Sequence, residues 1–202
     1  MPNLQPDQVY QLLRNLTSPV VAITCQRDGK GNGMISDSAV RASIAPTVPR
    51  LSVYVHKFNF SHDLIFETGR FVLHLLRHDQ FELIHRLGFV SGRERDKLAA
   101  IAHRPGVLGA PVLDDCYAHF ECRVVNVMDT GSSTCFLGDV AAVGHGAAQQ
   151  PSGEVMTAAY FRANMPAAWR AEYEALLRAA QAYAAERSRD IRPVVWKGLE
   201  QR

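Results

Sequence analysis

The chain has 202 residues, of which 47% are hydrophobic, so a single domain with a sizeable core is expected. The formal net charge of +2 gives no electrostatic argument for nucleic acid as a partner, and no apolar run is long enough to span a membrane. The first residues lack a basic segment followed by an apolar one, so we expect no secretory signal and a cytoplasmic location.

The first half of the chain predicts short strands with short helices between them. Apolar residues three or four positions apart indicate helices, alternation and β-branched residues indicate strands, and glycine and proline indicate turns. In chain order these signals predict a helix over 7–16, a strand over 20–26, a turn over 27–32, a strand over 33–40, a loop over 45–50, a strand over 51–56, a helix over 62–67, a strand over 71–76, and helices over 79–89 and 94–101. The first two strands and the turn between them form a hairpin.

The second half predicts one long hairpin followed by a helix. Residues 117–128 alternate between polar and apolar, which is typical of a strand with one apolar face. A turn over 129–132 leads to a partner strand over 133–144, and a loop over 146–153 precedes a helix over 166–187. The regular strand–helix alternation of a parallel sheet is missing. The order therefore favours a mainly β fold, a small antiparallel barrel with peripheral helices.

Cysteines and histidines form no recognisable metal or redox motif. No cysteine pair has the C-x-x-C spacing, so we expect reduced, mostly buried thiols, with a reactive thiol as the less favoured alternative. His74 and His78 are four residues apart, but one lies on a strand and the other precedes a helix. We predict no metal site. Structural or solvent-facing roles are expected for the histidines, except for His62 and, more weakly, His145.

A glycine-rich turn leads into an unusual strand. Gly29, Gly31 and Gly33 superficially match a dinucleotide fingerprint, but they lie between two strands instead of opening a helix. Their first role is to let the chain turn. The residues over 34–43 are then small or polar at most positions, so a ligand could approach the backbone and find hydrogen-bonding groups. The alternative is an edge strand with a solvated face.

A second polar segment follows the strand predicted over 51–56. Lys57, Asn59 and Ser61 lie where a strand leads into a helix, and an ammonium near the amides of a helix start suits a phosphate. The alternative is an ordinary helix start with Ser61 as the capping residue.

Taken in order, these segments resemble the flavin reductase-like FMN-binding family, whose fold is a split barrel. The resemblance spans roughly residues 18–145. It is carried by the strand over 18–24, the glycine turn with Gly33-Met34 and the serines up to Ser43, and the segments over 57–62, 69–76 with Gln80, 109–113, 118–122 and 138–140.

The resemblance implies where a flavin would bind. It places a split barrel over 1–150, with its core at 18–145, and a C-terminal helical extension of the same domain over 151–202. FMN, or alternatively FAD, would lie along the small-residue strand. The ring and ribityl chain would be flanked by Met34, Ile35, Ser36, Asp37, Ser38 and Ser43, and the phosphate would be approached by Lys57, Asn59, Ser61 and His62. Arg41 stands where the family often has a small residue and would either pair with the phosphate or obstruct the site.

The function implied is an NAD(P)H-dependent flavin reductase. Such an FMN-binding oxidoreductase would be a homodimer that supplies reduced flavin or electrons to a partner such as a monooxygenase, with NADH or NADPH as co-substrate. No catalytic side chain is predicted, because the flavin carries the hydride chemistry. Two alternatives stay open: a flavoprotein that passes electrons to a partner without using nicotinamide, and a barrel that has lost flavin and binds another ligand or only a partner. The C-terminal helix could be a dimer arm, a lid or ordinary packing.

Overall fold

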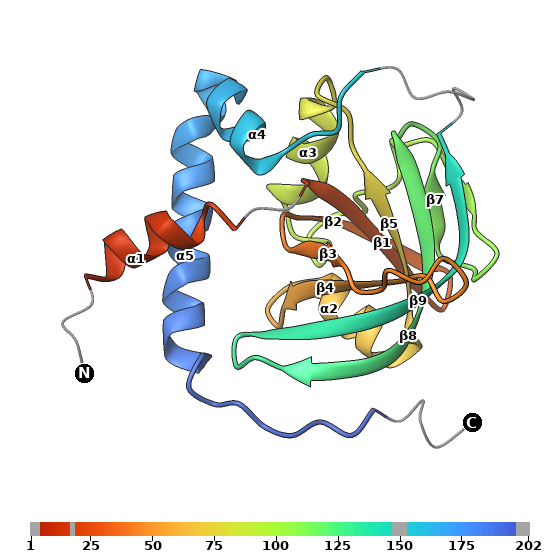
Figure 1. The fold of residues 1–202 in the computed structure, drawn as a ribbon. Helices are drawn as coiled ribbons and strands as arrows, with labels where there is room; N and C mark the ends of the chain where they lie inside the picture. The colour runs from red at the N-terminus through yellow and green to blue at the C-terminus, as the bar shows by residue number, and fades with distance from the viewer. Residues whose placement is uncertain (1–4, 17–18, 147–152, 197–202) are drawn as a thin grey trace.

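The computed structural model describes residues 5–16, 19–146 and 153–196, and it shows a curled antiparallel sheet with helices around it (Figure 1). Seven strands form this sheet in the order β2-β1-β5-β8-β9-β4-β3, and every neighbouring pair is antiparallel. The strands are β1 Val21–Arg27, β2 Lys30–Ser36, β3 Ala39–Arg41, β4 Arg50–His56, β5 Arg70–Leu75, β8 Ala118–Asp129 and β9 Ser133–His145. Two short strands, β6 His103–Pro105 and β7 Pro111–Leu113, pair separately.

The seam of the barrel lies at Asp37 and Ser38. These two residues alone separate β2 from β3, although β2 and β3 are the opposite edges of the sheet. Because three Cα steps span at most about 11 Å, the two edges must come close together, and the sheet curls into a barrel. The backbone N–H of Tyr54 donates to the Ser38 carbonyl at 3.1 Å and ties the seam to β4.

This seam corrects the strand predicted over 33–40. The chain pairs with β1 as far as Ser36 and then joins β4 from Ala39 onward, so the segment is two strands and not one. A single strand cannot follow both edges, because crossing the seam requires the backbone to leave the first ladder. The hairpin of β1 and β2 is confirmed, with its turn at Asp28 and Gly29 in the left-handed region.

Five α-helices are found in the described part of the chain. They are α1 Pro6–Leu13, α2 Phe60–Thr68, α3 Phe81–Gly88, α4 Ala158–Asn164 and α5 Arg170–Arg187, the last preceded by a 3₁₀ turn over Ala167–Trp169. Helix α2 packs against β1, β2 and β4, and it ends at Gly69 with φ 66°, the left-handed cap that glycine adopts easily. Helices α1, α4 and α5 lie together on one side of the barrel (Figure 1). None of the helices described is long and apolar enough to cross a membrane.

The core has two main parts. One cluster fills the barrel and includes the fully buried Phe71 and Phe136. The second lies between the sheet and α3 and α4, where Ile84, Leu87 and Phe161 are buried. All four cysteines are free thiols, three of them buried, as expected.

Other predictions were wrong or incomplete. Residues 94–101 form turns instead of a helix, and Asp96 accepts a hydrogen bond from the Leu98 N–H, a local contact that competes with helix formation. The strand expected over 117–128 is confirmed, and two of its alternating polar residues, His119 and Glu121, are buried. Helix α4 and the strands β6 and β7 were missed. Ser18, the first residue of the segment over 18–24 that carries the family resemblance, lies outside the described residues.

Candidate functional site

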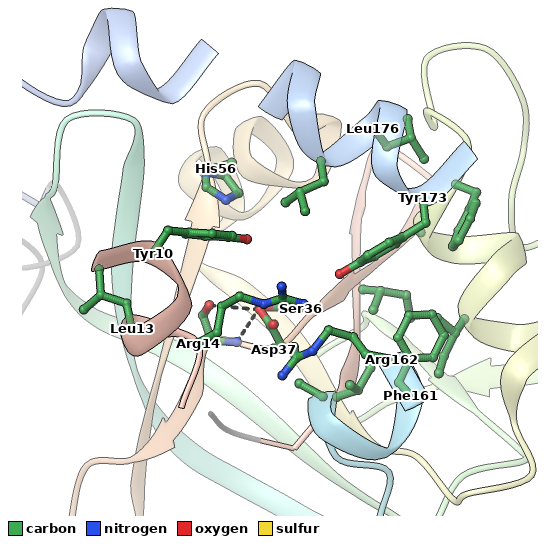
Figure 2. Close-up of a pocket in the computed structure, with 18 of the residues that line it drawn as sticks. Tyr10, Leu13, Arg14, Ser36, Asp37, His56, Phe161, Arg162, Tyr173 and Leu176 are labelled. Carbon is green, nitrogen blue, oxygen red and sulfur yellow. Dashed lines mark hydrogen bonds between the residues drawn. The ribbon is translucent and has the colours of Figure 1, made fainter. Parts of the chain in front are cut away.

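A cavity of about 480 Å³ opens at the seam of the barrel. Its floor is the segment over 35–38, and its walls come from α1, α3, α4, α5 and the end of β4 (Figure 2). The lining includes Tyr10, Arg14, Ile35, Ser36, Asp37, Ser38, His56, Phe89, Phe161, Arg162, Tyr173, Leu176 and Leu177. The volume falls in the range of about 300–1,000 Å³ that is typical of small-molecule sites.

The floor offers short polar side chains at the point where the strand leaves its ladder. The Ser38 N–H donates to Ser36 Oγ at 3.1 Å, and the Ser38 hydroxyl donates to Asp37 Oδ1 at 3.3 Å. These local bonds hold the turn and keep its side chains close to the backbone. The floor therefore presents short polar side chains beside the larger Ile35.

The helical wall brings aromatic rings and guanidinium groups to the cavity. Tyr10 and Arg14 are four residues apart at the end of α1, and the Arg14 guanidinium lies 5.6 Å from the Tyr10 ring centroid. Tyr173 on α5 packs against Phe89 and Phe161, with centroid distances of 6.3 and 5.9 Å. Burial raises the pKa of the Tyr173 phenol, and the Asp37 carboxylate raises it further. Tyr173 therefore stays a neutral donor at neutral pH.

His56 lies on the β4 side of the same cavity. Its Nδ1 is 2.9 Å from the Ser133 hydroxyl, and its ring stacks on Phe58 with centroids 5.2 Å apart. Desolvation lowers the pKa of His56, and the nearby Asp37 carboxylate opposes that shift in part. The imidazole is thus neutral at neutral pH and can offer one N–H.

A second, more apolar groove of about 470 Å³ lies next to the first, on the other side of the seam. It is lined by Arg41 and Ser43 among the predicted site residues, and its rim includes the exposed side chains of Val40, Ile44 and Val143. The predicted segment over 34–43 is therefore divided, since residues 35–38 line the cavity, whereas residues 39–41 and 43 line the groove.

Five predicted residues line neither space. Met34 is buried in the barrel core, and Asn59 is the residue before α2, without a side-chain cap. The Lys57 Nζ lies 2.7 Å from Asp129 Oδ1.

Ser61 and His62, the remaining two, are also engaged within the protein. Ser61 is fully buried and its hydroxyl accepts a hydrogen bond from Asn32 Nδ2 at 2.7 Å. His62 Nε2 is 2.9 Å from the Thr134 hydroxyl, and burial lowers its pKa despite the contact with Asp63.

The cavity is also lined by residues that were not predicted from the sequence. Tyr10, Arg14 and Arg162 belong to helices at either end of the chain, and no local pattern shows that these helices meet over the seam. His56 is the last residue of the strand predicted over 51–56, directly before the second polar segment, and this position was the one signal that could have indicated it. The end of β4 reaches the cavity through His56, whereas Lys57 does not line it.

Comparison with known proteins gives a consistent result. Residues 13–168 match the family described as "Flavin reductase like domain". The chain is 32% identical to a high molecular weight rubredoxin from Moorella thermoacetica over 74% of its own length, although it spans only 63% of that protein. It is 27% identical to the reductase subunit HsaB of a flavin-dependent monooxygenase from Mycobacterium tuberculosis, covering 86% of this chain and 93% of the relative.

The fold has solved counterparts as well. The crystal structure of an FMN-binding protein from Thermus thermophilus with bound p-hydroxybenzaldehyde aligns with a TM-score of 0.62 and 25% identity, covering 69% of this chain and 79% of that one. The mainly antiparallel split-barrel fold expected from the resemblance is confirmed. The chain therefore belongs to the flavin reductase-like family of flavin-binding oxidoreductases.

Proposed function

We propose that this protein is an NAD(P)H-dependent flavin reductase that binds FMN, or alternatively FAD, in the seam cavity. The observation that carries the proposal is the position of residues 35–38. They form the floor of a cavity large enough for a small-molecule ligand, and they match the segment that the family resemblance assigns to the flavin. The match to a monooxygenase reductase subunit supports the role of supplying reduced flavin to a partner enzyme.

The residues present fit a flavin. Ser36 and Ser38 on the floor have small side chains, so a flat ring could approach the backbone there, beside Ile35 and Asp37. Aromatic side chains of Phe89, Phe161 and Tyr173 supply an apolar wall, and two arginines bring positive charge that suits a phosphate.

In this account the chain's own residues bind, orient and exclude water. Bound flavin would accept a hydride equivalent from the nicotinamide and pass it on. The hydroxyls of Ser36 and Ser38 would orient the ring through hydrogen bonds. Neutral His56, held by Ser133, would offer an N–H from the opposite wall. Tyr173 on α5 would limit the access of water to the cavity.

The other predicted flavin contacts involve residues that do not line the seam cavity, and we propose them on separate grounds. Arg41 and Ser43 would reach the flavin from the neighbouring groove. Contacts of Lys57, Asn59, Ser61 and His62 with the phosphate stay predictions, and each of these side chains would need to rearrange or act through a neighbour. Met34 would support the floor from inside the barrel.

A homodimer is proposed from the second groove. Its exposed apolar rim, with Val40 50%, Ile44 87% and Val143 66% accessible, is the kind of surface that association covers. Burial of this groove against a second copy would bring the two seams close to the subunit interface.

A second candidate is a flavoprotein that passes electrons to a protein partner without using nicotinamide. It is favoured by the 32% identity to a high molecular weight rubredoxin. In this case the cavity would hold the same flavin, and the electron donor or acceptor would be a protein.

Anaerobic titration separates these functions. The purified protein is loaded with FMN, and flavin absorption is followed while NADH or NADPH is added in separate experiments. Rapid, stoichiometric bleaching by at least one nucleotide is expected for the reductase. Retained colour with both nucleotides, followed by bleaching with a chemical reductant, would favour the second candidate. A protein that binds no flavin would contradict both.

A further inference from the structure

Two guanidinium groups from separate helices reach the seam cavity. Arg14 ends α1 and Arg162 lies in α4, and both side chains extend toward the floor at Ser36 and Asp37 (Figure 2). These helices are about 150 residues apart in the sequence. The fold brings the two helices to one cavity, so the two arginines lie together there although they are far apart in the sequence.

Neither arginine forms an ion pair in the part of the chain that the structure describes, since no carboxylate there lies within ion-pair distance of Arg14 or Arg162. Eight of the other fifteen arginines in that part of the chain do pair with a carboxylate. Asp37 is the nearest acidic residue of the lining, and it makes its hydrogen bond with Ser38. Two arginines against one aspartate leave the cavity with net positive charge.

Both arginines are also half-buried residues, so they are less well hydrated than fully exposed arginines. An anion that enters the cavity would replace lost water contacts with charge-assisted hydrogen bonds. The hydroxyls of Tyr10 and Tyr173 point into the same space and could add neutral donors (Figure 2). Planar, forked donors of this kind match phosphate oxygens.

We propose that Arg14 and Arg162 form a nucleotide-phosphate site in the seam cavity. This inference deepens the proposed function and rests on it. The phosphate could be carried by FMN or by the nicotinamide dinucleotide, and the chemistry of recognition is the same for both. In either case the helical layer of α1 and α4 would select a phosphorylated ligand over its dephosphorylated form.

The test uses the full chain with Arg14→Gln, Arg162→Gln and the double substitution. Arg178→Gln is the matched control, because Arg178 is exposed on α5, lies outside the cavity lining and pairs with Glu174. Thermal unfolding and circular dichroism establish that each variant is folded. Calorimetric titration then compares inorganic pyrophosphate, FMN and riboflavin, and steady-state assays compare NADH and NADPH.

The double variant is expected to bind pyrophosphate at least about tenfold more weakly than the control. If the pair holds the flavin phosphate, FMN affinity falls by about tenfold or more while riboflavin affinity is unchanged. If it holds the phosphate of the hydride donor, FMN affinity is unchanged and the KM for NADH or NADPH rises with little change in kcat. Lysine at both positions should restore part of the affinity, because charge is kept while the forked geometry is lost.

Equal affinities of the folded double variant and the control for FMN and for the dinucleotides would overturn the proposal, even if pyrophosphate binding were reduced. Failure of the proposed function is seen separately. A wild-type protein that binds neither flavin nor nicotinamide nucleotide contradicts that function. The pyrophosphate titration still tests the arginine pair in that case. If the wild-type protein also binds no pyrophosphate, the pair is not a phosphate site.

Discussion

The Nζ of Lys57 lies 2.7 Å from Oδ1 of Asp129 and joins the end of β4 to the tip of the β8–β9 hairpin. Asp129 also accepts hydrogen bonds from the backbone N–H groups of Gly131 at 2.7 Å and Arg192 at 3.2 Å. Burial alone raises the pKa of the Asp129 carboxyl, but the bonds from Lys57 and the two backbone groups outweigh it and lower the pKa. Asp129 thus anchors three separate segments as an anion.

We therefore expect Lys57→Ala to lower the free energy of unfolding by about 1–3 kcal/mol, because it leaves a buried carboxylate without its cation. Asp129→Asn should cost a similar amount. Urea unfolding of both variants measures this, and unchanged stability of Lys57→Ala would show that the ion pair contributes nothing.

The same pair of variants tests the predicted phosphate contact of Lys57. If the Lys57 ammonium also reaches a phosphate, the affinity for FMN should fall in Lys57→Ala and not in Asp129→Asn. Titration with FMN measures both affinities. Equal FMN affinities in the two variants would leave Lys57 with a structural role alone.

The buried hydrogen bond between Asn32 and Ser61 gives a second prediction. Asn32 is 2% exposed, and a Cβ at Gly92 would lie 2.0 Å from its Oδ1, so the amide is buried with Gly92 packed closely against its oxygen. Ser61→Ala should cost about 1–3 kcal/mol, because it leaves a buried N–H unpaired. Ser91→Ala is a suitable control, since its hydroxyl accepts only a local backbone bond and the expected change is within about 0.5 kcal/mol. A Ser61→Ala variant as stable as this control would refute the argument.

Stability should fall in mild acid because of His74. This imidazole is fully buried, its Nδ1 is 3.3 Å from the Ala22 carbonyl, and its Nε2 accepts the Leu113 N–H at 3.0 Å. Burial is the main cause that lowers the pKa of His74 to about 3. Because the folded-state pKa lies below the unfolded one, the contribution of His74 is fully present above about pH 6.5 and is lost as the pH falls toward 3.

We expect this one group to lower the free energy of unfolding by about 1.4 kcal/mol for each pH unit of acidification in that window. His74→Gln keeps an acceptor for the Leu113 N–H and should remove that part of the slope. His56, His62 and His119 also have lowered pKa values, so some acid sensitivity should remain. Urea unfolding at several pH values between 5 and 8 measures the difference. Identical slopes in wild type and His74→Gln would count against this assignment.

The apolar groove gives a prediction about assembly. Ile44→Asp places a charge on its exposed rim and should convert a homodimer to a monomer on sizing with light scattering. Val107→Asp is the matched control, because Val107 is 73% exposed but lies in the β6–β7 turn, outside the groove. A dimer that survives Ile44→Asp, or that is lost equally in Val107→Asp, would argue against the groove as the interface.

Much of the fold was readable from local patterns. The strand at β4 shows its buried face in the alternation of Leu51, Val53 and Val55, and the stop of α2 is marked by Gly69. Patterns failed where a distant contact decides the conformation. The break at Asp37 reflects closure of the barrel, and His119 is polar yet buried because Gly144 leaves space for its ring.

The site was predictable in part for the same reason. Residues 35–38 line the cavity, and the short polar side chains of Ser36, Asp37 and Ser38 can be recognised from the sequence alone. The roles of Lys57 and Ser61 depend on Asp129 and Asn32, which are 72 and 29 residues away, and no local signal reveals these partners. Arg14 and Arg162 were missed because their helices meet only in three dimensions.

The central claim is that the seam cavity holds a flavin, and a crystal structure of the full chain grown with FMN tests it most directly. The account predicts electron density for the isoalloxazine ring against residues 35–38, between that floor and the wall that contains Tyr173. Density for FMN at another surface with the cavity filled by water, or no bound FMN at saturating concentration, would contradict it.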